Sequence, residues 1–334
     1  IGFKSIQRKN ELIVMEINLI VQQIFVLVFL AIIGVVATKV NVIEKNIKTG
    51  LTKIIFNLTL PFLIITQVSS LEITRQILIN WGFVIILSFF SILFFLVIGK
   101  ITDRILKLPP KQSTIHILHT AFGNAVFLGF PILDALFPNG EGILYGIIYF
   151  LTQNTTMWTL GIYMFTKEQN NGKRKVDGLK KLLNPNTIAF FIGLGMLFLN
   201  IHIPDFMFSS LHGLGKTTMY LAMLYIGAVL ADFHLKAMVK NKTTFILTLN
   251  KLLIGPILFL FIIKALLVLT PINVNHTALT VLVLEAAMPC QTLMVILARK
   301  FNKDDFYATQ NLSVSTLLSI ITLPFIYFLS QLVL

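Results

Sequence analysis

Charged side chains are scarce in this chain: they make up 12% of its 334 residues, whereas a soluble domain carries about 25%. Acidic residues are the scarcest, 14 against 27 Lys and Arg, and Cys290 is the one cysteine, which excludes an intramolecular disulfide. The longest polar stretch, residues 166–181, is too short to be a catalytic domain. Hydrophobic residues dominate instead, at 56% with a mean hydropathy of +0.86. This composition indicates an integral membrane protein whose main partner is the lipid bilayer.

Apolar runs long enough to cross a bilayer, about 20 residues each, recur along the whole chain. Ten spans are predicted, at residues 17–39, 47–69, 77–102, 113–136, 142–165, 184–201, 206–233, 243–270, 276–300 and 306–333. The predicted fold class is therefore an all-α polytopic membrane protein. Its units are an N-terminal tail (1–16), a first five-helix repeat (17–165), a cytoplasmic loop (166–183) and a second five-helix repeat (184–334). Met15 stands just before the first run, so residues 1–14 are either a tail or a mis-assigned start.

The excess of positive charge, formally +13, orients these spans. The basic residues lie in short segments between apolar runs and form no stripe with stacking aromatics, so we expect no nucleic-acid partner. Of the 27 Lys and Arg residues, 21 fall on one side of the spans, in alternate loops and the adjoining span ends. By the positive-inside rule that side is cytoplasmic. This predicts a multi-pass protein of the cell membrane with both termini outside.

Helix breakers and polar residues interrupt the fourth span of each half. Residues 120–131 read TAFGNAVFLGFP, and residues 284–292 read LEAAMPCQT. An unpaired backbone group in hydrocarbon costs several kcal/mol, so a spanning helix is interrupted only where protein or a water-filled cavity receives the freed groups. Because each half has five spans, homologous halves must insert with opposite topology, and the two interruptions should meet near the bilayer centre. Such a pair of breaks points to a transporter's binding site.

Several segments of the chain are similar to one known family. They are residues 122–131 followed by Leu136 and Phe137, residues 286–290, 295–301, 57–62 and 322–324. As a set they resemble the auxin efflux carrier family, whose bacterial members include malate and malonate permeases. The resemblance implies a 5+5 inverted repeat with crossing, broken helices four and nine, and a homodimer formed largely through spans two and seven. It also implies an elevator-like motion of spans three to five and eight to ten, and the architecture is similar to that of bile-acid sodium symporters.

Pro131 and Pro289 are the first candidate substrate-binding residues. Proline cannot donate to the helix ladder, so each frees an upstream carbonyl and lets a new half-helix begin, whose N-terminal amides attract an anion. The alternative is an ordinary proline kink. Asn124 either bonds a substrate carboxylate, caps the broken helix or joins two helices. Gln291 and Thr292 are the matching donors in span nine.

Three further polar residues stand inside apolar runs. Gln153 and Asn154, in the middle of the fifth span, resemble positions that contact substrate in plant carriers of this family, or else they are helix-packing contacts. Glu285 is the one acid well inside a run. A carboxylate within the membrane is costly and therefore indicates function, here the binding of a proton or, as in the sodium symporters, of a cation. The alternatives are a pairing with Lys264 or an outward-facing position.

The sequence thus predicts a secondary transporter for a small organic anion, such as the dicarboxylates malate and malonate or another carboxylate. No arginine lies deep within a span, so half-helix dipoles and neutral Asn, Gln and Thr donors would meet the anion's charge. A sodium-coupled symporter of the bile-acid type is the first alternative, and a membrane receptor or enzyme is the second. An enzyme needs convergent catalytic groups and a receptor usually carries a signalling domain. The sequence offers neither, so we expect no enzyme activity, no cofactor and no metal site.

Overall fold

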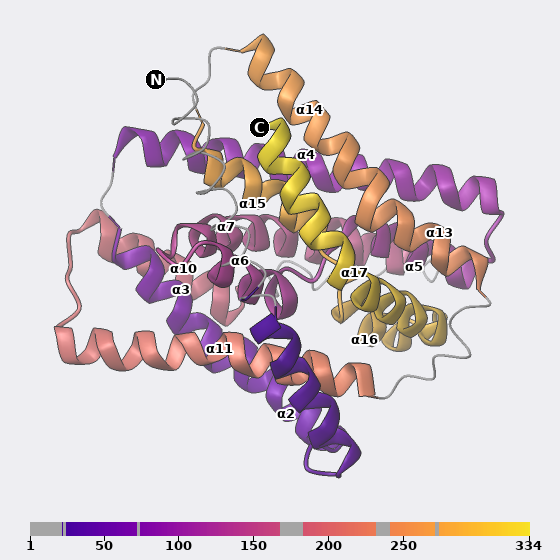
Figure 1. The fold of residues 1–334 in the computed structure, drawn as a ribbon, viewed down its shortest axis with the longest axis horizontal. Helices are drawn as coiled ribbons and strands as arrows, with labels where there is room; N and C mark the ends of the chain where they lie inside the picture. The colour runs from indigo at the N-terminus through magenta and orange to yellow at the C-terminus, as the bar shows by residue number, and fades with distance from the viewer. Residues whose placement is uncertain (1–21, 23–24, 72–73, 168–182, 232–240, 271–273) are drawn as a thin grey trace, which may run out of the picture.

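The computed structural model describes residues 22, 25–71, 74–167, 183–231, 241–270 and 274–334, and most of these are helical (Figure 1). Within these ranges there is no strand, as the all-α prediction requires. The helices and π-helical turns (η) of the first half are Phe25–Lys39, α2 (Lys45–Ile54), η1 (Ile55–Thr59), α3 (Leu60–Ser69), α4 (Arg75–Leu106), α5 (Pro110–Ala121), η2 (Ala125–Gly129), α6 (Phe130–Leu136), α7 (Glu141–Thr156), η3 (Met157–Gly161) and α8 (Ile162–Thr166). Those of the second half are α10 (Pro185–Phe198), α11 (Asp205–Ala231), α13 (Lys242–Leu249), η4 (Asn250–Ile254), α14 (Gly255–Leu269), α15 (His276–Ala286), α16 (Leu293–Lys300) and α17 (Asp305–Val333).

Five helical runs in the described ranges are long and apolar enough to cross a membrane. They are Lys45–Ser69, Arg75–Leu106, Asp205–Ala231, Lys242–Leu269 and Asp305–Val333. Shorter apolar helices run over Phe25–Lys39, Ala125–Leu136, Pro185–Phe198 and His276–Ala286. Two of these shorter helices flank the interruptions that the sequence predicts. The predicted tail and nearly all of the predicted cytoplasmic loop lie outside the described residues.

Prolines account for most of the π-helical turns. η1, η2 and η4 each end two residues before a proline, namely Pro61, Pro131 and Pro256. A proline ring collides with the carbonyl four residues earlier, and one extra residue in the preceding turn moves that carbonyl away. The helix therefore continues through each proline. Consequently Pro131 does not begin a half-helix, contrary to the sequence-based interpretation, because the run Ala125–Leu136 is continuous.

The helices pack as two groups. α3 packs mainly on α10 and α11, and α11 crosses the lower part of Figure 1. In the second group α4 packs on α5 and α7, α15 packs on α7, and α17 packs on α13 and α16. η2 and α6 belong to the second group and also contact α11. This contact brings the first predicted interruption to the boundary between the groups.

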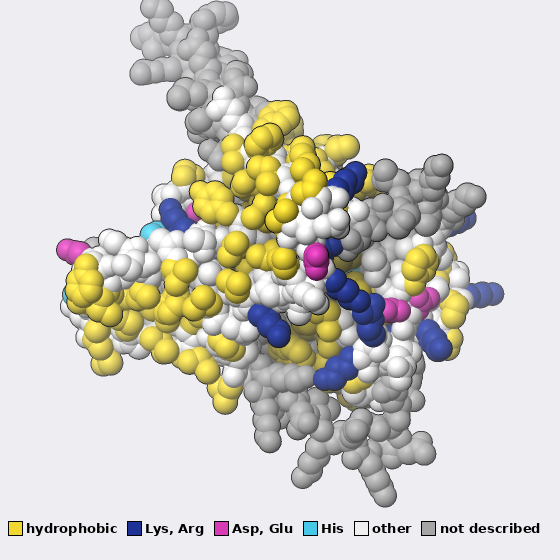
Figure 2. Space-filling model, turned by 90° about the horizontal axis from the view of Figure 1, so that it is seen from below, with side chains coloured by type: hydrophobic (Ala, Val, Ile, Leu, Met, Phe, Trp, Pro, Cys, Tyr) yellow, Lys and Arg dark blue, Asp and Glu magenta, His cyan; other side chains and the backbone are white. Residues whose placement is uncertain are grey.

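Large hydrophobic side chains remain exposed along the helices. Phe25, Ile86, Val268 and Ile321, for example, are 68%, 68%, 75% and 72% exposed. Figure 2 shows such side chains spread over the middle and left of the molecule, whereas most of the Lys and Arg side chains lie in its right half. An apolar surface of this extent marks contact with a membrane or another protein. It agrees with the composition in indicating a membrane protein.

Candidate functional site

Two helix interruptions are in contact inside the molecule. The first, residues 122–124, separates α5 from η2, and the second, residues 287–292, separates α15 from α16. A short antiparallel bridge between Gly123 and Cys290 joins them. Two segments that lie far apart in the sequence, and that both carry helix breakers, therefore meet at one point.

Hydrogen bonds across this bridge satisfy backbone groups that the interruptions free. The N–H of Asn124 donates to the carbonyl oxygen of Pro289 at 2.8 Å, and the N–H of Gln291 donates to the carbonyl oxygen of Phe122 at 3.2 Å. The N–H of Cys290 donates to Oγ of a side chain in α17, Ser315, at 3.0 Å. Unpaired groups in hydrocarbon would cost several kcal/mol each. These bonds allow both helices to end inside the protein without unpaired backbone groups at these positions.

Gln153 of α7 supports the first interruption. Its Oε1 accepts from the N–H of Gly123, and its Nε2 donates to the carbonyl oxygen of Gly123, both at 3.0 Å. A Cβ at Gly123 would lie 3.1 Å from Cβ of Met288 and 3.2 Å from the carbonyl oxygen of Glu285, so glycine lets the two segments approach closely. Because both ends of its amide bond to Gly123, Gln153 holds the interruption in place, and its Nε2 has a second N–H that these bonds do not use.

A cavity of about 210 Å³ lies against both interruptions. Five of the candidate residues from the sequence line it: Asn124, Gln153, Asn154, Gln291 and Thr292. No charged side chain is among the described residues that line it. A ligand in this cavity would therefore meet neutral polar groups.

The polar lining has unused hydrogen-bonding capacity. Nδ2 of Asn124 is 3.4 Å from Oγ1 of Thr292, a long contact. Oε1 of Gln291 is buried with no hydrogen-bond partner among the described residues. A buried polar atom without a partner costs about 1–3 kcal/mol. A ligand group that donates a hydrogen bond to Oε1 of Gln291, such as a hydroxyl, would recover part of this free energy.

Both helices that follow the interruptions begin at the cavity. Asn124 is the N-cap of η2 and Thr292 is the N-cap of α16, and neither side chain makes a capping hydrogen bond. The first turn of a helix carries a partial positive charge and N–H groups without helical partners. In α16 the N–H groups of Met294 and Val295 already donate to the carbonyl oxygens of Gln291 and Thr292. Two such helix starts on one cavity favour an anion. They also show that the half-helices begin at Ala125 and Leu293 and not at the prolines.

The prolines themselves do not line the cavity. Pro289 lies within the second interruption, where its carbonyl oxygen accepts from Asn124. Pro131 lines a separate cavity of about 580 Å³ with Asp134 and His276. Of the two, only Pro289 helps to shape the interruptions.

Aromatic rings form another part of the lining. Phe127 of η2 stacks on Tyr225 of α11 with ring centroids 4.5 Å apart, and it meets Phe56 of η1 edge-on at 5.3 Å. Phe150 and Trp158 line the cavity as well. Because η1 and α11 belong to the first helix group and η2 to the second, the cavity lies between the two groups. It offers an apolar wall beside polar groups.

Glu285 is buried in the interior near the end of α15 and does not line the cavity. Its exposed fraction is 0%, and neither carboxylate oxygen has a hydrogen-bond partner in the described part of the chain. A Cβ at Gly129 would lie 2.8 Å from Oε1 of this carboxylate, and a Cβ at Gly146 would lie 3.4 Å from it. Lys264 is exposed on α14. The alternatives of a pairing with Lys264 and of an outward-facing Glu285 are therefore wrong.

Lys251 of η4 is a buried charged residue that the sequence reasoning missed. The positive-inside rule assigns it to the cytoplasmic span ends, but its exposed fraction is 0%. Its Nζ lies 3.5 Å from the carbonyl oxygen of Ala121, the last residue of α5, and 4.7 Å from the ring centroid of Phe95. The sequence feature that indicates burial is the position of Lys251 well inside the apolar run Lys242–Leu269. Lys251 stands nine residues after Lys242, the start of this run, which is about 13 Å along the helix axis. A lysine side chain is too short to bring its ammonium group back over that distance to the membrane surface.

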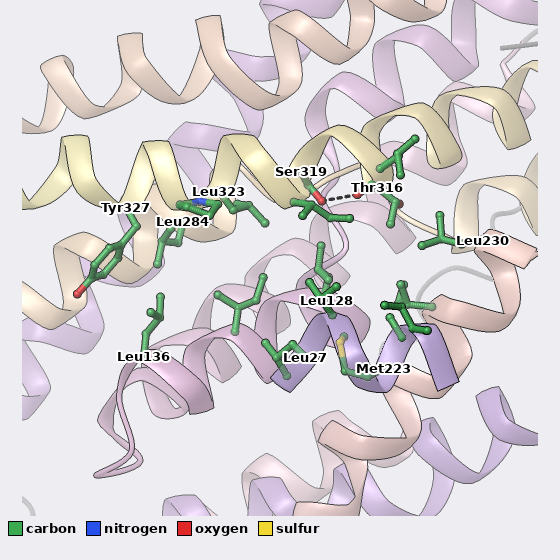
Figure 3. Close-up of a pocket in the computed structure, with 18 of the residues that line it drawn as sticks. Leu27, Leu128, Leu136, Met223, Leu230, Leu284, Thr316, Ser319, Leu323 and Tyr327 are labelled. Carbon is green, nitrogen blue, oxygen red and sulfur yellow. Dashed lines mark hydrogen bonds between the residues drawn. The ribbon is translucent and has the colours of Figure 1, made fainter. Parts of the chain in front are cut away.

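A third cavity, of about 300 Å³, is unsuited to an anion. It lies between the helix Phe25–Lys39, η2, α6, α11 and α17, and Figure 3 shows Leu27, Leu128 and Met223 among its lining residues. The Oγ of Ser319 donates to the carbonyl oxygen of Thr316 at 2.7 Å within α17. The wall is thus almost wholly apolar. Of the described cavities, the one at the interruptions is lined by residues of both interruptions and by no charged side chain among the described residues.

The chain matches the model of a known protein family. A family model described as "Membrane transport protein" matches residues 19–327. No curated protein matches the chain. The matched range covers both interruptions and all of the helices that line the cavity between them.

Proposed function

Because the chain belongs to the auxin efflux carrier-type membrane transport family, we propose that it is a secondary transporter that moves a small organic anion through the cavity at the two interruptions. The observation that carries this proposal is the pair of uncapped helix starts at Asn124 and Thr292, on one cavity without charged side chains among its described lining. Partial positive charge from two helix N-termini attracts an anion. Neutral side chains then supply hydrogen bonds without holding the anion too tightly to release it.

The proposed substrate is a small carboxylate. The dicarboxylates malate and malonate are the first candidates, with Asn124, Gln291 and Thr292 as donors to carboxylate oxygens. The aromatic lining, with Phe127 stacked on Tyr225, favours a second candidate, a monocarboxylate with an apolar body. A volume of about 210 Å³ limits either candidate to a small molecule.

We further propose a 5+5 inverted repeat of ten spans, with the two broken helices crossing at the substrate site. Its support is the contact between the fourth predicted span of each half, through Gly123 and Cys290. The cavity also reaches Asn184 and Pro185 at the start of α10. These residues follow the basic loop, so the cavity would open to the cytoplasm, and the termini would face outward. The clustering of Lys and Arg in the right half of Figure 2 fits this orientation.

The two packing groups suggest how transport proceeds. The group around α4, α5, α7, α15 and α17 would move as a unit, while α3, α10 and α11 stay fixed as the scaffold of a homodimer in the cell membrane. Glu285 and a proton, or a sodium ion, would couple the motion to a gradient, and Asn154 would contact the substrate from α7. The cavity between the groups would open to each side in turn.

Uptake into proteoliposomes tests the proposed function. The purified protein should take up at least one labelled carboxylate from a panel that contains malate, malonate, succinate and an aromatic monocarboxylate, and unlabelled substrate should compete. Uptake that depends on sodium would favour the bile-acid type of symport, whereas uptake driven by a pH gradient in choline would favour proton coupling. If no carboxylate on the panel is bound or transported by monodisperse protein, the proposed substrate class is wrong.

A further inference from the structure

Two helices end side by side behind the interruptions. α5 ends at Ala121 and α15 ends at Ala286, and a Cβ at Gly123 would lie 3.2 Å from the carbonyl oxygen of Glu285. The C-terminal end of a helix carries partial negative charge on its last carbonyl groups. The buried carboxylate of Glu285 adds a further acid to this place. A buried negative charge of this kind is either balanced by a nearby cation or removed by protonation.

Lys251 reaches this place from another helix. Its Nζ is 3.5 Å from the carbonyl oxygen of Ala121 and lies over the ring of Phe95 at 4.7 Å. Both contacts suit an ammonium ion, because a carbonyl oxygen accepts its protons and the face of an aromatic ring attracts its charge. Lys251 and Glu285 make no direct ion pair, and both carboxylate oxygens are without a hydrogen-bond partner among the described residues, so their charges interact only through space. The ammonium group thus lies beside the C-terminal end of α5, where a bound cation would balance the negative charge.

The position of Lys251 argues against two other roles, contact with the substrate and contact with water at the membrane surface. It does not line the cavity at the interruptions, so it is not a direct contact for the substrate. Its burial prevents its head from reaching the aqueous side of the membrane. His119 and Cys290 are the other titratable groups with which it interacts electrostatically. Among these groups, Glu285 is the carboxylate that can balance the ammonium.

We propose that the Lys251 ammonium is a built-in cation that balances Glu285 and the C-terminal end of α5, so that no metal cation has to bind behind the interruptions. In the transport cycle, which presupposes the proposed function, Lys251 is a positioning residue: it holds the ends of α5 and α15 together while the substrate binds on their other side. A fixed ammonium here also makes sodium unnecessary at Glu285.

Melting temperatures of the purified protein test this role without any substrate, so failure of the carboxylate screen does not affect the result. The variants are Lys251→Met, Glu285→Gln, the double variant Lys251→Met with Glu285→Gln, and Lys264→Met as the matched control on the exposed face of α14. Each is measured in sodium chloride and in choline chloride of equal ionic strength. The wild type and Lys264→Met should melt alike in both salts. Lys251→Met should melt several degrees lower.

The double variant decides whether charge is the cause. Adding Glu285→Gln removes the unbalanced carboxylate, so the double variant should melt at a higher temperature than Lys251→Met. If both side chains acted only through packing, the losses of the two single variants would add instead. If Lys251→Met yields no monodisperse protein, recovery of monodisperse protein by Glu285→Gln is the same test. The proposal is overturned if the second substitution restores nothing. It is also overturned if sodium stabilises the wild type and Glu285→Gln abolishes that effect, because a metal site would then exist beside Lys251.

Discussion

The backbone N–H of Asn124 donates to the carbonyl oxygen of Pro289 at 2.8 Å, although the two residues stand in different halves of the chain. Each residue belongs to an interruption that would be costly alone, because its backbone groups would lack partners in the membrane. Together they provide those partners for each other. The same contact brings the uncapped starts of η2 and α16 to one cavity. A structural requirement of the membrane and the geometry of an anion site are thus met by one arrangement.

Gln153 is expected to affect stability and Asn154 to affect binding. Gln153→Ala removes both hydrogen bonds to Gly123, and each buried group left unpaired costs about 1–3 kcal/mol. The melting temperature should therefore fall by several degrees. Asn154→Ala, at the neighbouring half-buried position, should leave it nearly unchanged and weaken substrate binding instead. Equal melting temperatures for the two variants would contradict the role of Gln153.

Gly129 is expected to be intolerant of a methyl group. In Gly129→Ala the new Cβ would lie 2.8 Å from Oε1 of Glu285, and overpacking of this kind costs about 1–3 kcal/mol. Gly195→Ala is the matched control, since a Cβ there meets no atom within 4 Å. Thermal unfolding should show Gly129→Ala to be the less stable of the two, and adding Glu285→Ala should relieve the loss. Similar stability of both alanine variants would mean that the carboxylate is not confined.

Glu285 is the proposed site of proton coupling. If it exchanges a proton during transport, Glu285→Gln should flatten the pH dependence of net uptake while leaving exchange of internal for external substrate. The charged and titratable groups with which this carboxylate interacts are Lys251 and Tyr149. Uptake in proteoliposomes over a range of external pH measures the effect. A pH profile identical to that of the wild type would remove Glu285 from the coupling mechanism.

Topology can be tested in the predicted cytoplasmic loop, at Asn171, which lies outside the described residues. A cysteine at this position in a Cys290→Ser background should react with a membrane-impermeant thiol reagent only after the cell interior is opened. The expectation rests on the 21 of 27 basic residues that share one side. Labelling in intact cells would contradict this prediction and would place the loop outside the cell.

Composition and apolar runs were sufficient to predict a helical membrane protein. The positions of the interruptions also followed from the sequence, because Gly123, Asn124 and Pro289 stand within apolar runs and weaken helix formation. Pro131 was misinterpreted for a local reason. A π-helical turn accommodates its ring, so the helix continues where a new start was expected.

The roles of other residues depend on contacts between distant segments. Gln153 reads as a polar residue of unassigned role until Gly123 is seen at both ends of its amide. Lys251 reads as an interfacial lysine until its contact with the end of α5 is known. Hydrophobic periodicity and composition describe one helix at a time. They do not show which residues of different helices come into contact, so these two roles could not be predicted.

Substrate affinity of Asn124→Ala and Gln291→Ala tests the central claim, that one anion is bound by both interruptions. Each substitution removes a neutral donor, and the loss of a hydrogen bond to a charged group costs about 1.5–3 kcal/mol. Equilibrium binding of the best carboxylate from the uptake screen, measured on monodisperse protein, should therefore be roughly ten- to hundred-fold weaker in both variants. Thr155→Ala, at an exposed position of α7, should bind as the wild type does. Wild-type affinity in both Asn124→Ala and Gln291→Ala would show that the anion binds elsewhere and that the interruptions are purely structural.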